Sequence, residues 1–240
     1  MYKKIFAFFI LIIFSLCLPI NAASEVFVWS NQASSVASKE VSAQPLTSDS
    51  NFTETSNPLN LECGSACLIE ASTGKVLYDY NMHEKLRPAS VTKVMSLLLI
   101  MEAVDSGKIS YNDVIPCTED AAAMGGSQIW LDVRESLTLD EMLKAICVSS
   151  ANDCVVATAD YLEGSQEAFV QKMNEKAQEL GMNDTTFKNC HGIDEDGHLT
   201  SSYDIAVMSR ELLTKHPNIT KYTTIYMDTL RNRKIRTCKY

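Results

Sequence analysis

The sequence predicts a mixed α/β (α+β) protein in which a pair of strands precedes a run of helices. Three observations support this class. The stretch "SACLIEASTGKVLYDYN" at 65–81 has the pattern of two short strands around a tight turn. Several later stretches between residues 90 and 213 repeat apolar residues with the helical period. The last stretch, "YTTIYMDTLRNRKIRTCKY", returns to a strand-like alternation around Ile225.

The first 60 residues are predicted to lie outside the folded domain. Residues 1–22 begin with Lys3 and Lys4 and continue into an apolar run and small residues, which is the layout of a secretory signal peptide. The run is shorter than the ~20 residues of a spanning helix, so an uncleaved membrane anchor is the weaker alternative. Residues 23–60 are rich in Ser, Thr, Asn and Gln and predict a flexible linker. The folded domain is expected at 61–240.

Charge and cysteine usage exclude several classes of protein. The net charge of −9 argues against a nucleic-acid binder, which would show a basic face. Of eight cysteines, one lies in the predicted signal peptide, and the rest form neither a C-x-x-C pair nor a Cys/His cluster with zinc spacing. Cys63 and Cys67 in a strand would stand ~13 Å apart, too far for a bridge. We expect most cysteines to be small core residues, and no metal or organic cofactor.

The remaining elements follow from periodicity and capping signals. Gly74 suits the turn of the first hairpin, and a helix is predicted from Ser90 to Val104, ended by Gly107. Thr138 and Glu141 form a capping box before a helix that runs into "SSAND". Three further helices are predicted in "DCVVATADYL", stopped by Gly164, in "SQEAFVQKMNEKAQEL", between Ser165 and Gly181, and in "SSYDIAVMSRELL".

The four histidines, Trp130 and Met124 are not expected to take part in catalysis or ligand binding. His83, His198 and His216 have no partners at ligand spacing and are predicted to lie on the surface. His191 is predicted to be structural rather than a general base. Trp130 and Met124 are expected to pack rather than to bind a ligand.

Ser90 and Lys93 are the leading candidates for catalysis. At the start of a helix, residues i and i+3 share a face, so the Lys93 amine can approach the Ser90 hydroxyl. A desolvated lysine has a lowered pKa and can act as the base that makes serine a nucleophile. The unpaired N–H groups of the first helical turn suit a developing oxyanion. The alternative is an ordinary helix start, since serine is a common cap and lysine a common helical residue.

Ser150 and Asn152 in "SSAND" extend this candidate site. A loop can turn both side chains towards one point, where the hydroxyl could relay a proton and the amide could hold a lysine and a substrate peptide. The alternative is again structural, because Ser, Asn and Asp are preferred in loops and caps, and Asp153 could merely start the next helix.

With these motifs in place, the chain resembles the low-molecular-weight D-alanyl-D-alanine carboxypeptidases, a family of penicillin-binding proteins. "LRPASVTKVMSLLL" and "SSAND" match the S-x-x-K and S-x-N motifs. "GSACLIEASTGKVLYDYN", "GGSQIWL" and "NCHGIDEDGHLTSSYDIAVMSREL" also resemble the family, over about Gly64 to Arg231. The resemblance implies Ser90 as acylated nucleophile, Lys93 as its base, and Ser150 and Asn152 as the second wall of the site.

The resemblance also implies a fold, a substrate and a location. The fold would be an antiparallel sheet flanked by helices, with a mostly helical lobe inserted between early and late strands. The substrate would be the peptidoglycan pentapeptide, which loses its terminal D-alanine, and β-lactams would act as inhibitors on the same serine. The protein would be secreted or held at the outer face of the cytoplasmic membrane, with peripheral membrane association left open.

One departure from the family concerns its third motif. K-T-G, expected roughly a hundred residues after Ser150, does not occur in the sequence. We therefore expect a chain truncated before the late strands, and an inactive product is one interpretation. Two alternatives to the carboxypeptidase remain: a serine β-lactamase, for which no Glu-x-x-Leu-Asn block follows "SSAND", and a degenerate, non-catalytic envelope protein.

Overall fold

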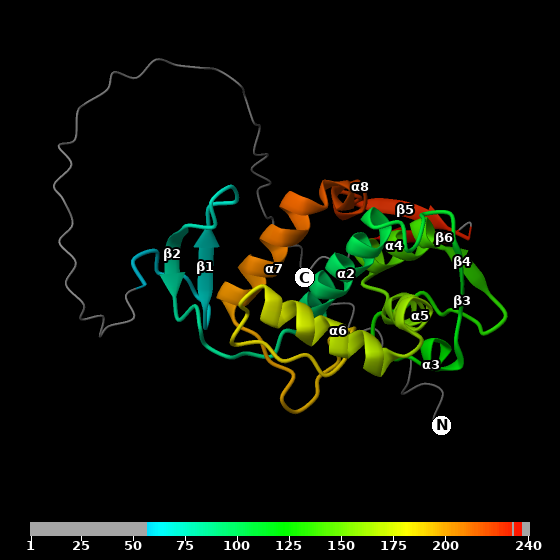
Figure 1. Cartoon of the computed structure of the whole chain (residues 1–240), viewed down its shortest axis with the longest axis horizontal. Coiled ribbons are helices and arrows are strands. Elements are labelled where there is room, and N and C mark those ends of the chain that lie inside the picture. Colours follow the sequence, from blue (N-terminus) through cyan, green and yellow to red (C-terminus); the bar gives the residue numbers. More distant parts are fainter. Residues whose placement is uncertain (1–56, 232, 237–240) are drawn as a thin grey trace, which may run out of the picture. The chain divides into compact units, whose positions relative to one another are not determined.

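The computed structural model describes residues 57–231 and the backbone of 233–236 (Figure 1). The predicted signal peptide and the linker up to residue 56 lie outside the described residues. All described residues belong to one compact unit, Asn51–Tyr240. In the part of the chain that is described, no helix has the length and apolar character needed to span a bilayer. The elements in chain order are β1 (Ala66–Ile69), β2 (Val76–Tyr80), η1 (Ala89–Thr92), α2 (Lys93–Asp105), β3 (Val114–Pro116), α3 (Glu119–Ala122), β4 (Ser136–Thr138), α4 (Leu139–Ser149), α5 (Asn152–Glu163), α6 (Gln166–Glu179), α7 (Ser202–Lys215), η2 (Pro217–Ile219), α8 (Thr220–Thr223), β5 (Met227–Leu230) and β6 (Arg233–Arg236).

The strands form three separate antiparallel pairs, β1–β2, β3–β4 and β5–β6. The predicted hairpin is confirmed, with Ala66 opposite Tyr80 and Gly74 at φ +77° in the turn. The side-chain carboxylate of Glu70 accepts hydrogen bonds from the backbone N–H groups of Ser72 and Thr73, which fixes this turn. Helix α7 packs against β1 (Figure 1). The described residues thus combine helices with small antiparallel sheets, and do not by themselves form one larger sheet.

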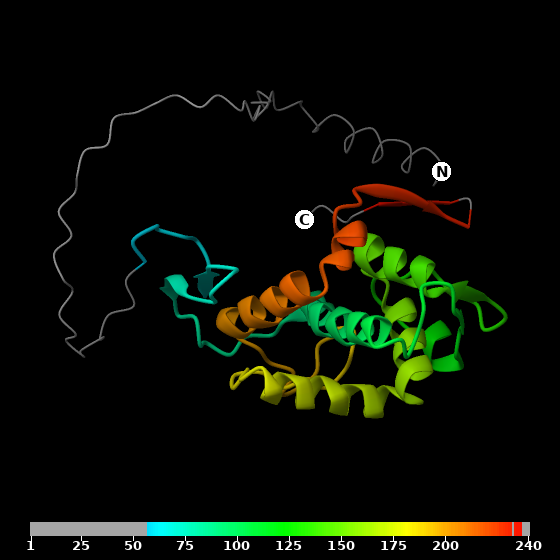
Figure 2. The same ribbon diagram turned by 45° about the horizontal axis from the view of Figure 1, so that its top comes forward.

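Helix α2 is the central element of the helical part (Figures 1 and 2). It packs against α7 on one side and against α5 and α6 on others. Leu98, Ile100 and Met101 are fully buried in it. A helix that is apolar nearly all round must be enclosed by other elements. The first residue of α2 is therefore held at a fixed place in the core.

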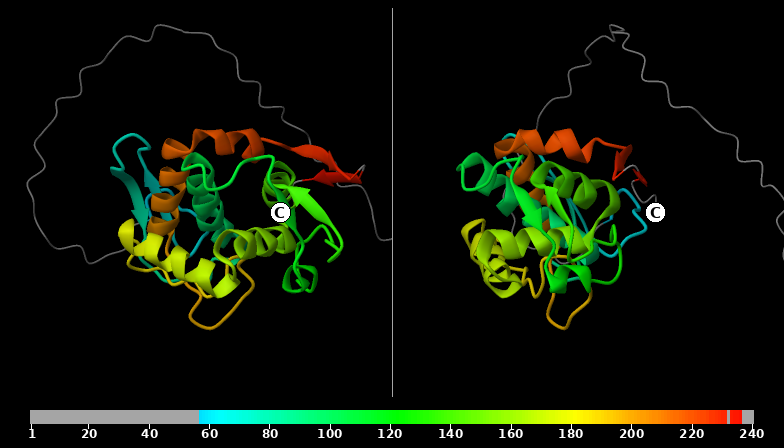
Figure 3. Two further views of the ribbon diagram at one scale, coloured as in Figure 1. Left: turned by 45° about the vertical axis from the view of Figure 1, so that its right-hand side comes forward. Right: turned by 90° about the vertical axis from the view of Figure 1, so that its right-hand side faces the viewer.

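Figure 3 shows the same helices from two further sides. Their boundaries follow the capping signals of the sequence. Thr138 and Glu141 form both hydrogen bonds of the capping box at the start of α4. Ser165 caps α6 by accepting a hydrogen bond from the N–H of Ala168. Gly164 and Gly181 take positive φ values of 81° and 72° just beyond α5 and α6, as the stop signals predict.

The surface assignment is wrong for two of the three histidines. His198 is only 1% exposed, and His216 is 9% exposed with its Nδ1 atom 2.5 Å from a carboxylate oxygen of Asp105. His83 alone is exposed, beside Asp184. Periodicity could not show this, because the partners that enclose each ring lie far away in the sequence.

The structure also tests the predictions for Trp130, Met124 and the strand around Ile225. Trp130 is 73% exposed, so the packing prediction is wrong for it, whereas Met124 packs against the core as predicted. Ile225 precedes the strand rather than lying in it, because the buried Tyr222 belongs to the short helix α8 and β5 starts only at Met227.

The described cysteines are free thiols. Cys117, Cys154 and Cys190 are buried, as predicted for small core residues, whereas Cys63 is exposed and Cys67 and Cys147 are partly exposed.

Replacing the cap of α4 tests the local determinants of this fold. Thr138→Ala removes the hydroxyl that accepts from the Glu141 N–H, and should lower the free energy of unfolding by about 1 kcal/mol. Thr138→Ser keeps the hydroxyl and should stay close to the original value. Urea unfolding followed by circular dichroism measures both, and equal stabilities for the two variants would contradict the capping role.

Candidate active site

Ser90 and Lys93 meet at the junction of η1 and α2. Ser90 lies in the short 3₁₀ turn and is exposed, whereas Lys93 is the first residue of α2 and is only 4% exposed. The Lys93 amine donates to Ser90 Oγ at 3.2 Å and to the backbone carbonyl of His191 at 2.6 Å. The spacing of three residues thus brings a buried amine to a hydroxyl that a substrate can reach.

Burial dominates the electrostatics of Lys93. Desolvation lowers the pKa of its amine from 10.5 to about 8. No carboxylate among the described residues forms an ion pair with it, so no counter-charge there offsets the cost of burying the charge. The neutral amine, which can accept a proton, therefore makes up about one-tenth of the population at pH 7, far more than for an ordinary lysine.

The segment around His191 closes over the start of α2. The Ser96 hydroxyl of α2 donates to the Cys190 carbonyl at 2.6 Å, next to the His191 carbonyl that holds Lys93. His191 Nδ1 accepts from the N–H of Ile193 at 3.1 Å, and burial lowers the pKa of its ring to about 4. The ring thus stays neutral, and what His191 offers Lys93 is its carbonyl oxygen.

Ala89 and Gly192 meet in an unusually close backbone contact. Ala89, just before Ser90, has φ +46°, and Gly192 has φ +91°. A Cβ atom on Gly192 would lie 1.9 Å from the Ala89 carbonyl oxygen. Only glycine fits at 192, for reasons of both space and backbone conformation.

Ser150 and Asn152 lie where α4 passes into α5. Ser150 ends α4 with φ +53°, and Asn152 is already the first residue of α5, so the expected loop is only two residues long. The Asn152 side-chain amide donates to the Gly125 carbonyl at 2.8 Å. Its Oδ1 atom is buried without a hydrogen-bond partner among the described residues. Asn152 and Lys93 thus lie on packed helices, α5 and α2, but are not hydrogen-bonded to each other.

Asp153 organises the neighbouring loop, a role that sequence reasoning missed. Its fully buried carboxylate accepts from the N–H groups of Ile129 and Leu131 at 3.1 and 3.0 Å. Between them Trp130 takes φ +56° and faces solvent. The acceptor role is readable only from the fold, because the two partners lie more than 20 residues away from Asp153.

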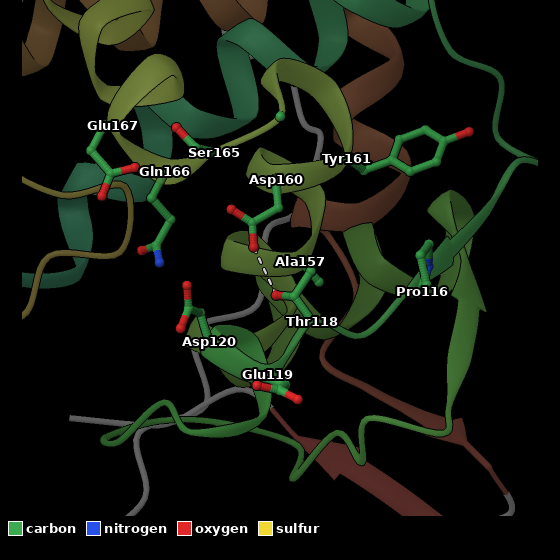
Figure 4. A pocket seen from close by; sticks show the side chains of 11 residues that line it. Pro116, Thr118, Glu119, Asp120, Ala157, Asp160, Tyr161, Ser165, Gln166 and Glu167 are labelled. Atoms are coloured by element: carbon green, nitrogen blue, oxygen red, sulfur yellow. Dashed lines mark hydrogen bonds between the residues drawn. The ribbon is translucent and has the colours of Figure 1, made fainter.

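Two cavities lie near α6, and neither is lined by Ser90, Lys93, Ser150 or Asn152. One of 450 Å³ is acidic, with Asp120, Asp160 and Glu167 around it, and Thr118 Oγ1 donates to Asp160 at 2.7 Å (Figure 4). The other, of 440 Å³, borders the site at His191. No group of His, Cys, Asp and Glu among residues 57–231 has the geometry of a metal site.

Comparisons with known proteins identify the family and the fold of the chain. The family described as D-alanyl-D-alanine carboxypeptidase, peptidase family S11, matches residues 51–239. D-alanyl-D-alanine carboxypeptidase DacF of Bacillus subtilis is 55% identical over 170 residues, which are 71% of this chain and 43% of that protein. Penicillin-binding protein 6B of Escherichia coli has a TM-score of 0.72 and 31% identity over 78% of this chain and 61% of its own. Penicillin-binding protein D2 of Listeria monocytogenes, crystallised with ampicillin, has a TM-score of 0.66 and 26% identity over 75% and 73%.

The fold is similar to that of penicillin-binding proteins. The chain belongs to the D-alanyl-D-alanine carboxypeptidase family of peptidase family S11. It spans 43% of the length of its Bacillus subtilis relative.

A pair of glycine variants tests the contact between Ala89 and Gly192. Gly107 also has a positive φ, 75°, but a Cβ there would meet nothing within 4 Å. Gly107→Ala should therefore cost only the backbone strain of about 1 kcal/mol. Gly192→Ala adds a clash with a backbone carbonyl and should lower the free energy of unfolding by roughly 3 kcal/mol or more. Equal losses in urea unfolding would contradict the close contact.

Proposed function

We propose that this chain carries the nucleophilic half of a serine-type D-Ala-D-Ala carboxypeptidase, with Ser90 as the residue that is acylated. The observation that carries the proposal is the exposed Ser90 hydroxyl 3.2 Å from a buried lysine amine with a lowered pKa. Family membership supports the reaction class. The activity remains a proposal because the chain covers less than half of DacF.

In the proposed reaction, Lys93 takes the proton of the Ser90 hydroxyl as the oxygen attacks the carbonyl carbon of the penultimate D-alanine. The peptide bond breaks, the terminal D-alanine amine receives a proton, and the peptide remains as an ester on Ser90. Water then hydrolyses that ester. Ser150 would relay the proton to the leaving amine, and Asn152 would turn its amide towards the peptide backbone.

The proposed substrate is the peptidoglycan pentapeptide, and β-lactams would acylate the same serine. The ampicillin complex of the Listeria monocytogenes protein supports the second point by analogy. Such a substrate lies outside the cytoplasm, so the proposal includes export to the cell envelope. We also propose that β1 and β2, with α7 against β1 and α2 against α7, belong to the flanked antiparallel sheet of this family, and that α3 to α6 form its inserted helical lobe.

Labelling with a fluorescent penicillin tests the nucleophile. The purified chain should take up one label, and Ser90→Ala should abolish the labelling because no other hydroxyl is hydrogen-bonded to Lys93 among the described residues. Ser106→Ala, at the end of α2, is the matched control and should label normally. Gel fluorescence and intact-protein mass report both. Labelling that survives in Ser90→Ala, or its absence from the unaltered chain, would sink the proposal.

The pH dependence of labelling tests the base. A lysine with its pKa at about 8 is only about one-tenth neutral at pH 7, and this fraction rises as protons are lost. The second-order rate constant of acylation should therefore increase nearly tenfold per pH unit below pH 7 and level off above about pH 8. Lys93→Arg, which cannot give up its proton, should remove the reaction. A rate that is flat between pH 6 and 9 would rule Lys93 out as the base.

A further inference from the structure

His198 is a buried titratable group beside the site that the proposed reaction does not use. Its ring is 1% exposed and forms two hydrogen bonds. The backbone N–H of Lys188 donates to Nδ1 at 2.9 Å, so this nitrogen carries no proton. In the neutral ring the proton is then on Nε2, which lies 2.7 Å from Thr92 Oγ1 and donates to it. Burial lowers the pKa of the ring and so favours this neutral form.

Thr92 connects His198 to the backbone of Ala89, the residue just before Ser90. Its hydroxyl accepts from His198 and donates its single proton to the Ala89 carbonyl at 2.8 Å. Ala89 has φ +46°, a conformation that is unfavourable for an L-residue and must be held by its surroundings. The Ala89 carbonyl is thus fixed on one side by Thr92 and on the other by the close approach of Gly192.

We infer that His198 is a positioning residue, which acts through the Thr92 hydroxyl to hold Ala89 in its left-handed conformation and so presents Ser90 to Lys93. Neither His198 nor Thr92 touches the substrate in this account. Thr92 lies between the two reacting residues in η1 and α2, and its side chain is fully buried, so it can hold the turn without obstructing the site. The effect on acylation rests on the proposed function. The series of hydrogen bonds from His198 through Thr92 to Ala89 does not.

Three threonine variants separate positioning from simple stability. Thr92→Val keeps the shape but loses the hydroxyl, and should slow acylation of Ser90 by a fluorescent penicillin about tenfold, the equivalent of one net hydrogen bond. Thr92→Ser keeps the hydroxyl and should restore the rate to within about threefold. Thr158→Val is the control: it removes another buried hydroxyl, bonded at 2.7 Å to the Cys154 carbonyl in α5, and should leave the rate unchanged.

A double-mutant cycle then links Thr92 to His198. His198→Gln in the Thr92→Val background should slow acylation no further, because the series of hydrogen bonds from His198 through Thr92 to Ala89 is already broken. Additive losses, or a Thr92→Val rate equal to that of the unaltered chain, would overturn the inference. Failure of the unaltered chain to take up any label would instead refute the proposed function.

Histidine NMR tests the hydrogen bonds of His198 even if the unaltered protein takes up no label. In the chain labelled with ¹⁵N-histidine, the signals lost in His198→Gln identify the ring. They should show an unprotonated Nδ1 and a protonated Nε2 near neutral pH, and the Nε2–H signal should shift in Thr92→Val but remain in Thr92→Ser. A protonated Nδ1, or a Thr92→Val spectrum identical to that of the unaltered protein, would show that the hydrogen bonds from His198 through Thr92 to Ala89 do not form. Either result would overturn the positioning role.

Discussion

The burial of one amine without a counter-charge is the constraint on which the rest of this site depends. Lys93 starts a helix whose body is enclosed by α5, α6 and α7, so its side chain cannot move freely towards solvent. Its polar contacts are the carbonyl of His191 and the hydroxyl of Ser90. A carboxylate partner would have kept the lysine charged. Two neutral oxygens accept from two of its three N–H groups and stabilise the charge less, so the amine loses its proton more easily.

The neighbouring backbone shows how firmly this arrangement is held. Ser96 fixes the Cys190 carbonyl, and the next residue's carbonyl meets Lys93. Gly192 then lets its own backbone approach Ala89, which has a conformation that few L-residues adopt. Strain of this kind persists only where the surroundings over-determine it. Contacts from both the helix and the 188–198 segment therefore converge on the residue before Ser90.

The sequence predicted local structure and the contact between Ser90 and Lys93 well, and long-range burial poorly. Periodicity, Thr138 with Glu141, and glycines such as Gly164 marked helices and their ends, because these signals act over a few residues. Ser90 and Lys93 were identifiable because their contact spans one helical turn. The buried His198 and the exposed Trp130 were not, since one is enclosed by residues far apart in sequence and the other lies in a loop held by a distant carboxylate.

Direct titration of the Lys93 amine is the most decisive measurement for this account. In the chain labelled with ¹³C at lysine ε-carbons, the signal absent from Lys93→Arg can be followed from pH 6 to pH 11. The account predicts a midpoint close to 8, set apart from the ordinary lysines. A midpoint close to the usual 10.5 would show that the amine stays charged beside Ser90, and the proposed chemistry would have no base.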